Sequence, residues 1–346
     1  MSTITSPIAP SPRDPFRILS LDGGGIRGLV TAVWLARLES KLGSPLADHF
    51  DLVAGTSTGG ILAAAVGLKI PAADMIDLYR KRARDIFPSA WARRWNRVGR
   101  TFTQGLSAPK YSEAGLRQVL LDVVGDRSFA QLAITPTLIT SYNTLTRTAL
   151  VFKNHKPEHQ SLLLRDILAA TAAAPTYFPA HVMQVEHADV CLIDGGVVAN
   201  NPTACAIAEA VRWNDARHPS LALKDFIVAS FGTGHATRPI TIAQAREWGA
   251  LEWAIPAIDV LMDGAGDATE YIARQLIADE NHFRFQTRLD KAFDAIDNAD
   301  EANLNALVNL ANHHLEAEGG EQNLARLANR LQPRPAYSGL GASASF

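Results

Sequence analysis

The stretch "RILSLDGGGIRGLV", residues 17–30, joins an apolar run to three consecutive glycines and then to a second apolar run. Residues 16–21 predict a buried strand, and a helix is predicted from Gly28 to a stop signal at Gly43. Glycines expose backbone N–H groups and let another group approach the chain closely. The loop between strand and helix is therefore predicted to receive a negatively charged group.

The rest of the chain continues this alternation of strands and helices. Further helices are predicted at 59–68 and 201–214, and residues 241–330 read as almost entirely helical. Glycines just past the strand ends predict an α/β fold with a mostly parallel sheet. Further strands are predicted within residues 50–55, 135–144, 148–154, 189–196 and 224–234.

The bulk composition limits the class of protein. The chain has 346 residues, of which 47% are hydrophobic, so it can bury a large core. A formal net charge of −2 argues against a nucleic-acid partner. We expect one catalytic domain over residues 15–330, a flexible arm at 1–14 and a flexible tail at 331–346.

The sequence also predicts where the protein works. No signal peptide is visible at the N-terminus, and the longest apolar run, residues 60–68, is far shorter than the ~20 residues needed to span a bilayer. The two cysteines, Cys191 and Cys205, form no metal-binding pair. A cytoplasmic chain without disulfides is the expectation, and peripheral association with a membrane is compatible with it.

A second motif, Gly55-Thr56-Ser57-Thr58-Gly59, lies between a predicted strand and a helix rich in small residues. This is the G-x-S-x-G pattern in the context of a nucleophile elbow, so Ser57 is predicted to be a nucleophile. Attack on an ester creates an oxyanion that needs N–H donors, each worth roughly 3 kcal/mol in the transition state. The glycine run at 23–25 can supply them.

The glycine loop also fits a different function. Its spacing Gly23-x-Gly25-x-x-Gly28 matches a dinucleotide-binding fingerprint, which calls for an acidic residue at the end of the next strand. Here that strand ends in the GTSTGG string, and Asp51 lies at its start instead. The position of Asp51 argues against nucleotide binding. A non-enzymatic binder of nucleotide or lipid is nevertheless kept as the alternative to a hydrolase.

A serine nucleophile needs a base, and the sequence offers several carboxylates. Asp194 follows a buried strand directly and precedes Gly195 and Gly196, so we expect it at the edge of the sheet where α/β proteins bind ligands. Asp22 is a rival because it precedes the glycine loop. Asp263 is a second rival, but residues 257–262 before it predict a helix, which would keep it off the sheet edge.

A Ser-Asp-His triad is a further alternative. The chain has ten histidines, and a triad histidine would be expected on a late loop. His235 and His282 are the two candidates in suitable positions, although no motif surrounds either of them.

Taken together, the motifs resemble those of the patatin-like phospholipases. The chain carries "DGGGIRG" at 22–28, "GTSTG" at 55–59 and "DGG" at 194–196, in the order of that family. The third motif has DGG where the family often has DGA. The resemblance covers roughly residues 16–290 and extends to flanking strings, namely "PKYSEAGL" at 109–116, "AATAAAPTYFPA" at 169–180, "LIDGGVVANNP" at 192–202 and "SFGTG" at 230–234.

The resemblance implies a fold and a mechanism. It implies a three-layer α/β fold with a helical C-terminal part, and hydrolysis of lipid acyl esters at a membrane surface without metal or cofactor. Ser57 would be the nucleophile, Asp194 its base, and the amides of Gly23, Gly24 and Gly25 the oxyanion hole, with Arg27 fixing that loop or contacting a lipid phosphate. The motif glycines carried over with them are Gly28, Gly55, Gly59, Gly195 and Gly196.

The resemblance leaves the subclass open. Some members of the family are activated by a cyclic dinucleotide and others are constitutive, and the residues do not separate these two kinds. Neither the lipid head group nor the oligomeric state, nor any small-molecule activator, is specified by the sequence.

A basic and aromatic segment provides a candidate membrane contact. Residues 80–100 carry eight arginines and lysines against a single acid, with tryptophans among them. Tryptophan with arginine is typical of segments at a lipid interface, although a solvated helix whose tryptophans pack on the core would look the same. The residues expected to dock beside the active-site mouth are Trp91, Arg93, Arg94 and Trp95.

Overall fold

The computed structural model describes residues 15–88, 109–134, 136–217, 222–235, 239–253, 256–289 and 295–332. The expected arm at 1–14 and the tail from residue 333 lie outside these ranges. Leu331, which was expected to begin the tail, ends the helix α14 (Gly320–Leu331) and is buried.

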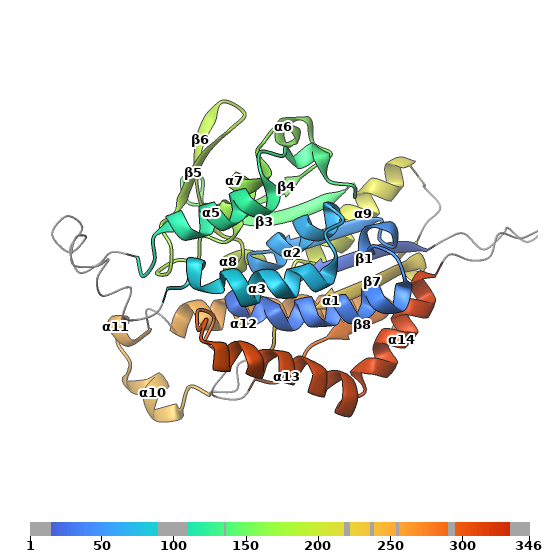
Figure 1. The fold of residues 1–346 in the computed structure, drawn as a ribbon. Helices are drawn as coiled ribbons and strands as arrows, with labels where there is room; N and C mark the ends of the chain where they lie inside the picture. The colour runs from blue at the N-terminus through green and yellow to red at the C-terminus, as the bar shows by residue number, and fades with distance from the viewer. Residues whose placement is uncertain are drawn as a thin grey trace, which may run out of the picture.

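One sheet of eight strands forms the middle of the molecule (Figure 1). Its order is β5-β6-β3-β2-β1-β7-β8, and β4 pairs with β3. The five strands from β3 to β8 in this order run parallel, as predicted, whereas β4, β5 and β6 join it through antiparallel pairs. The strands are β1 (Phe16–Leu21), β2 (Leu52–Thr56), β3 (Thr137–Asn143), β4 (Thr148–Lys153), β5 (His181–Val185), β6 (Ala188–Asp194), β7 (Phe226–Phe231) and β8 (His282–Phe285).

The sheet is buried on both faces because successive side chains of a strand point to opposite sides. In β1, Leu19 and Leu21 enter one hydrophobic core, while Ile18 enters a second core on the other face. The helices that contribute to the first core are α1 (Gly28–Leu42), α2 (Thr58–Gly67), α3 (Ala72–Ile86), α5 (Glu113–Val124), α7 (Leu164–Thr171), α13 (Glu301–Ala317) and α14.

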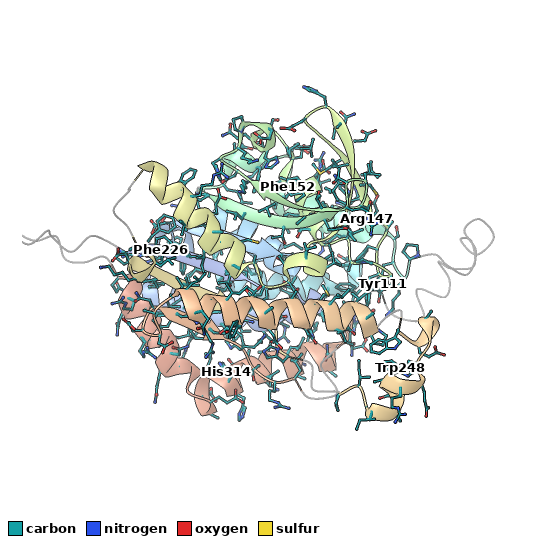
Figure 2. The ribbon with its side chains drawn as sticks, turned by 180° about the vertical axis from the view of Figure 1, so that it is seen from behind. Tyr111, Arg147, Phe152, Phe226, Trp248 and His314 are labelled. Carbon is teal, nitrogen blue, oxygen red and sulfur yellow. The ribbon has the colours of Figure 1, made fainter. Side chains whose placement is uncertain are left out.

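The second core lies under α9 (Thr203–Arg217) and α12 (Pro256–Leu276), which cross the face seen in Figure 2. The result is the three-layer α/β arrangement that the resemblance implies. The remaining α-helices of the described residues are α6 (Pro157–Gln160), α8 (Gly196–Ala199), α10 (Ile242–Glu247) and α11 (Ala250–Trp253).

The prediction that residues 241–330 are almost entirely helical is wrong at one place. Residues 282–285, with the sequence HFRF, form β8 and pair in parallel with β7. Four residues are too few to show a strand period, so pairing with β7 decides their conformation.

The strand that carries Asp194 reaches its position by an unexpected route. Asp194 was expected at the end of a strand on the ligand edge of a mostly parallel sheet, and β6 is antiparallel to β3, with Asp194 paired to Ser141. Thr56 at the end of β2 is paired to Thr140, the neighbour of Ser141. The C-terminal end of β6 therefore lies at the same height in the sheet as the C-terminal end of β2. Asp194 consequently lies beside Ser57, the residue that follows Thr56.

No helix among the described residues is both long and apolar enough to cross a bilayer. The candidate docking residues Trp91, Arg93, Arg94 and Trp95 lie outside the described ranges.

Candidate active site

Ser57 stands on a sharp turn between β2 and α2. Its φ of 54° and ψ of −124° are strained for a residue with a side chain, as a nucleophile elbow requires. A Cβ at Gly59 would collide with the carbonyl oxygen of Leu21, and one at Gly55 would collide with the backbone of Gly59. The elbow thus packs against the end of β1 with no room for side chains, which explains both glycines of the motif.

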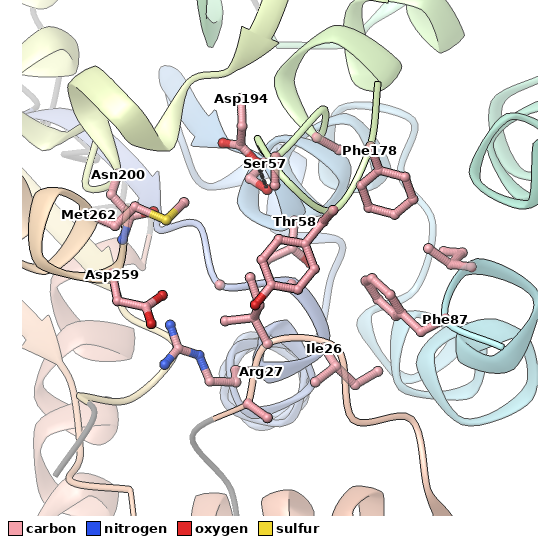
Figure 3. Close-up of a pocket in the computed structure, with 18 of the residues that line it drawn as sticks. Ile26, Arg27, Ser57, Thr58, Phe87, Phe178, Asp194, Asn200, Asp259 and Met262 are labelled. Carbon is pink, nitrogen blue, oxygen red and sulfur yellow. Dashed lines mark hydrogen bonds between the residues drawn. The ribbon is translucent and has the colours of Figure 1, made fainter. Parts of the chain in front are cut away.

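Asp194 lies directly against this serine (Figure 3). The Ser57 hydroxyl donates a hydrogen bond of 2.7 Å to Oδ2 of Asp194, and the Gly196 N–H donates one of 2.7 Å to Oδ1. Asp194 is only 1% exposed and Ser57 only 7%. Burial raises the pKa of the Asp194 carboxyl to about 6, against the opposing effect of its two hydrogen bonds. The group can therefore take up and release a proton close to neutral pH.

A threonine that the sequence analysis did not single out joins the two halves of this pair. The Thr171 hydroxyl accepts a hydrogen bond of 2.8 Å from the Ser57 N–H, and its carbonyl accepts one of 3.3 Å from the Gly195 N–H. The next turn contributes the carbonyl of Ala173, which accepts from the Asp194 N–H at 3.0 Å. The end of α7 therefore sets the separation of Ser57 and Asp194.

The glycine loop packs on the other side of Ser57, and its amides are not equivalent. The Gly23 N–H donates to the carbonyl of Asn200 at 3.0 Å, so the expectation that it contributes to an oxyanion hole is wrong. Gly24 and Gly25 line the cavity beside Ser57, and their N–H groups have no hydrogen-bond partner within the described residues. These two amides are the available donors.

Arg27 does not complete an oxyanion hole either. Its backbone N–H donates to the carbonyl of Gly24 at 3.1 Å, and its guanidinium points toward Asp259 of α12, away from Ser57 (Figure 3). The side chain is largely buried in the wall of the cavity. The structure thus fits a role for Arg27 in fixing the loop, or in meeting a charged group of the ligand.

The rival carboxylates have other partners. Asp22 is buried and accepts a hydrogen bond of 2.6 Å from Arg284, which explains its position under the glycine loop without a role as a base. Asp263 lies within α12, as the sequence predicted, yet its side chain also lines the cavity. Burial raises the pKa of Asp263, and the charge of Arg27 opposes this.

The triad alternative finds no support in the geometry. His282 lies 3.8 Å from Glu270, and the backbone N–H of His235 donates to Thr287. No histidine is among the described residues that line the cavity at Ser57. Within the described ranges there is also no cluster of three or more His, Cys, Asp or Glu side chains that could hold a metal ion.

Ser57 and Asp194 open onto a cavity of about 560 Å³ between α3, α5, α12 and the segment that follows α7. One end carries the polar groups described above, and the remainder is lined by aliphatic and aromatic side chains. Such a cavity accommodates a hydrocarbon chain whose polar end reaches Ser57. Its apolar lining includes Ile61, Leu78, Ala83, Ile86, Phe87, Leu116, Val119, Leu120, Val123, Phe178, Trp248, Val260 and Met262.

An α/β fold with a buried Ser–Asp pair, a glycine loop and an apolar cavity defines a protein of the acyl-hydrolase class. Comparison with known proteins agrees. Residues 19–207 match the patatin family, described as patatin-like phospholipase. The chain belongs to this family of lipid acyl hydrolases, and its fold class is that of the family.

Individual relatives support the same assignment. Patatin-like protein 2 of Arabidopsis thaliana is 33% identical over 314 residues, which cover 78% of this chain and 75% of the relative. Patatin-like protein 3 of the same plant is 28% identical and covers 89% of this chain and 82% of the relative. The solved human GIVD cytosolic phospholipase A2 is far more distant, with a TM-score of 0.45 and 12% identity, covering 92% of this chain and 60% of that one.

The contacts of Thr171 predict that it positions the nucleophile. Thr171→Val keeps the shape of the side chain and leaves the buried Ser57 N–H without its acceptor, at a cost of about 1–3 kcal/mol. We expect kcat for a short soluble ester to fall roughly 10- to 100-fold with little change in KM. Thr171→Ser retains the hydroxyl and should restore most of kcat. A Thr171→Val enzyme with the kcat of the wild type would contradict this role.

The raised pKa of Asp194 predicts a dependence of stability on pH. Because the pKa of Asp194 is about 6 in the folded protein and the ordinary pKa of an aspartate is 3.8, the unfolded chain releases this proton at lower pH than the folded protein. This group therefore costs nothing below about pH 4, and its cost grows to on the order of 3 kcal/mol above pH 6.

Asp194→Asn removes that cost, so its stability relative to the wild type should rise by about 2 kcal/mol between pH 4 and pH 7.5 in urea unfolding. Asp189→Asn changes an exposed carboxylate on the same strand and serves as the control. A stability difference for Asp194→Asn that stays constant across this pH range would show that the Asp194 pKa is not raised.

Proposed function

We propose that this protein hydrolyses acyl esters of membrane phospholipids, with Ser57 as nucleophile and Asp194 as general base. One observation carries the proposal: the buried 2.7 Å hydrogen bond from the Ser57 hydroxyl to a carboxylate at the polar end of an apolar cavity. A serine is a weak nucleophile until a base lies within hydrogen-bond distance, and Asp194 lies at that distance from Ser57.

In the first half of the reaction, the ester carbonyl lies at Ser57 and the acyl chain occupies the apolar part of the cavity. The Ser57 oxygen attacks the carbonyl carbon while its proton moves to Oδ2 of Asp194. The tetrahedral intermediate then collapses, the bond to the leaving alcohol breaks, and Asp194 returns the proton to that alcohol oxygen. An acyl-serine and a lysolipid result.

The second half uses the same carboxylate. Asp194 takes a proton from water as the water oxygen attacks the acyl-serine, and collapse of this second intermediate breaks the bond to Ser57. The serine oxygen recovers its proton from Asp194, and the fatty acid leaves. A carboxyl with a pKa of about 6 is suited to both directions of transfer near neutral pH.

The loop and the helix beside Ser57 supply the electrostatic part of the reaction. The unengaged N–H groups of Gly24 and Gly25 line the cavity and would donate to the oxyanion. The N-terminus of α2 begins one residue after Ser57, which places the positive end of the helix dipole at the same point. Both interactions strengthen as negative charge develops, which is the requirement for transition-state stabilisation.

The cavity favours a lipid over a small polar ester. Each methylene group transferred from water to an apolar lining contributes about 0.8 kcal/mol, so a long acyl chain binds much better than a short one. Arg27 brings a cation to the same cavity wall and is suited to a phosphate of the head group.

Replacing either member of the pair tests the proposal. Ser57→Ala and Asp194→Asn should each lower fatty-acid release from phosphatidylcholine vesicles by about 10³-fold, because one loses the nucleophile and the other the base. Asp189→Asn, on the exposed part of the same strand, should retain the wild-type rate. Mass spectrometry of the lipids identifies the bond that is cleaved.

Two results would contradict the assignment. Residual hydrolysis above one per cent in folded Ser57→Ala would show that another group attacks the ester. Full activity in Asp194→Asn would show that a different base accepts the proton of Ser57.

We also propose that the segment containing Trp91, Arg93, Arg94 and Trp95 docks the enzyme on the bilayer. Its described neighbours in the chain support this, since Phe87 lines the cavity and Lys110 pairs with Asp297, adjacent to the cavity residue Ile296. Each basic residue close to an anionic surface contributes about 1 kcal/mol of binding.

The combined variant Trp91→Ala, Trp95→Ala, Arg93→Glu and Arg94→Glu should bind anionic vesicles at least about tenfold more weakly in a sedimentation assay. Hydrolysis of a short soluble ester should be unchanged, because the catalytic pair is intact. Unchanged vesicle binding, or an equal loss on the soluble ester, would assign these residues a structural role instead.

A further inference from the structure

The chain segment that follows β7 contacts the glycine loop through one side chain, Thr233. The Thr233 hydroxyl donates a hydrogen bond of 2.8 Å to the carbonyl of Gly23, and Thr233 is only 2% exposed. A Cβ at Gly24 would lie 2.2 Å from the same hydroxyl oxygen. Gly24 lines the cavity at Ser57, whereas Thr233 is not among the described residues that do so. The glycine loop therefore lies between Thr233 and the cavity.

This hydrogen bond acts on the peptide unit that carries one of the two available amides. A peptide bond is planar and trans, so the Gly23 carbonyl and the Gly24 N–H form one rigid unit and point in opposite directions. Thr233 holds the carbonyl on its own side of the loop. The Gly24 N–H, which has no hydrogen-bond partner within the described residues, therefore points away from Thr233 and toward the cavity.

The two neighbouring peptide units have anchors of their own. The Gly23 N–H belongs to the preceding unit and donates to the carbonyl of Asn200 at 3.0 Å. The Gly24 carbonyl belongs to the following unit and accepts from the Arg27 N–H at 3.1 Å. Because the glycines on both sides of the middle unit have free dihedral angles, their backbone alone does not fix its orientation. Of the hydrogen bonds between described residues, the one from Thr233 is what holds this unit.

The position of Thr233 is set by the strand that the sequence analysis missed. The Gly232 N–H donates to the carbonyl of Phe285, the last residue of β8, at 2.8 Å. The Gly234 N–H donates to the side-chain oxygen of Gln286 at 2.7 Å. Both chain neighbours of Thr233 are thus tied to the end of β8, and this fixes the direction of the threonine hydroxyl.

We propose that Thr233 is a positioning residue for the oxyanion hole, because it orients the peptide unit that presents the Gly24 N–H to Ser57. This inference rests on the proposed hydrolysis at Ser57. Without the threonine hydroxyl, the buried Gly23 carbonyl has no partner, and a buried carbonyl in that state is costly. Rotation of the peptide unit relieves this cost by turning the carbonyl toward the cavity. A carbonyl then faces the oxyanion where an N–H is needed.

Steady-state kinetics on a short, water-soluble ester test this role. Thr233→Val replaces the hydroxyl by a methyl group and keeps the shape of the side chain. We expect kcat to fall about 10- to 100-fold with KM within about twofold of the wild type, because an oxyanion-hole donor acts mainly on the transition state. Thr233→Ser keeps the hydroxyl and should bring kcat to within about threefold of the wild type.

Thr137→Val is the matched control. The Thr137 hydroxyl donates a hydrogen bond of 2.7 Å to the carbonyl of Ile134, and Thr137 is fully buried. It lies at the start of β3 and is not among the described residues that line the cavity. This variant also loses a buried hydrogen bond from a threonine to a backbone carbonyl. It should therefore lower the melting temperature as Thr233→Val does, but its kcat should equal that of the wild type.

Binding of a transition-state analogue gives a second readout that a change in stability does not move. The Ser57 oxygen adds to the carbonyl carbon of an alkyl trifluoromethyl ketone, its proton passes to Asp194, and the ketone oxygen becomes an oxyanion. The inhibition constant of this ketone should rise in Thr233→Val by the same factor by which kcat/KM falls. The corresponding alcohol forms no oxyanion, so its inhibition constant should not change.

Three outcomes would overturn the inference in an enzyme whose wild type cleaves the ester. The first is a Thr233→Val variant with the kcat and the ketone inhibition constant of the wild type. The second is an equal loss of kcat in Thr233→Val and Thr137→Val, which would assign both effects to stability. The third is a rise in KM at unchanged kcat, which would assign Thr233 to substrate binding. A folded wild type that cleaves no ester would instead overturn the proposed function, and the inference with it.

Discussion

The site depends on a hydrogen bond between a serine and a carboxylate that are both shielded from water. Three segments far apart in the chain end at this point: β2 brings Ser57, β6 brings Asp194, and α7 brings Thr171, whose hydroxyl and carbonyl hold the other two. Burial raises the pKa of Asp194 toward neutrality. The packing that brings the two side chains together therefore also allows Asp194 to exchange a proton near neutral pH.

The motif glycines around Ser57 and Asp194 are explained better by close packing than by a need for backbone flexibility. The glycines of the elbow and of the DGG motif lie where a Cβ would strike backbone or side chains of neighbouring elements. Gly195, for example, lies against Thr140 of β3, and Gly196 lies against Met262 of α12. The motifs are thus the places where backbone from different layers comes into contact.

Sequence reasoning placed most elements well and failed where conformation depended on a distant partner. The prediction of β1, the glycine loop and α1 is confirmed, because apolar periodicity and a glycine stop signal are local features. It missed β8, a strand of four residues that is defined by β7. The sequence predicted a strand that ends at Asp194 but not its direction: β6 runs antiparallel to β3, and its end still lies level with the end of β2.

What the sequence determined by itself is the local geometry of the elbow that carries Ser57. Strand, Gly-x-Ser-x-Gly and helix lie within about twenty residues, and their steric demands are met inside that stretch and by the end of β1. Only the tertiary structure decided which carboxylate faces Ser57, which amides of the glycine loop remain unengaged, and that Thr171 joins the loops that carry Ser57 and Asp194. Those outcomes rest on hydrogen bonds between residues more than a hundred positions apart and on the exclusion of water from Asp194, and neither leaves a periodic signal in the sequence.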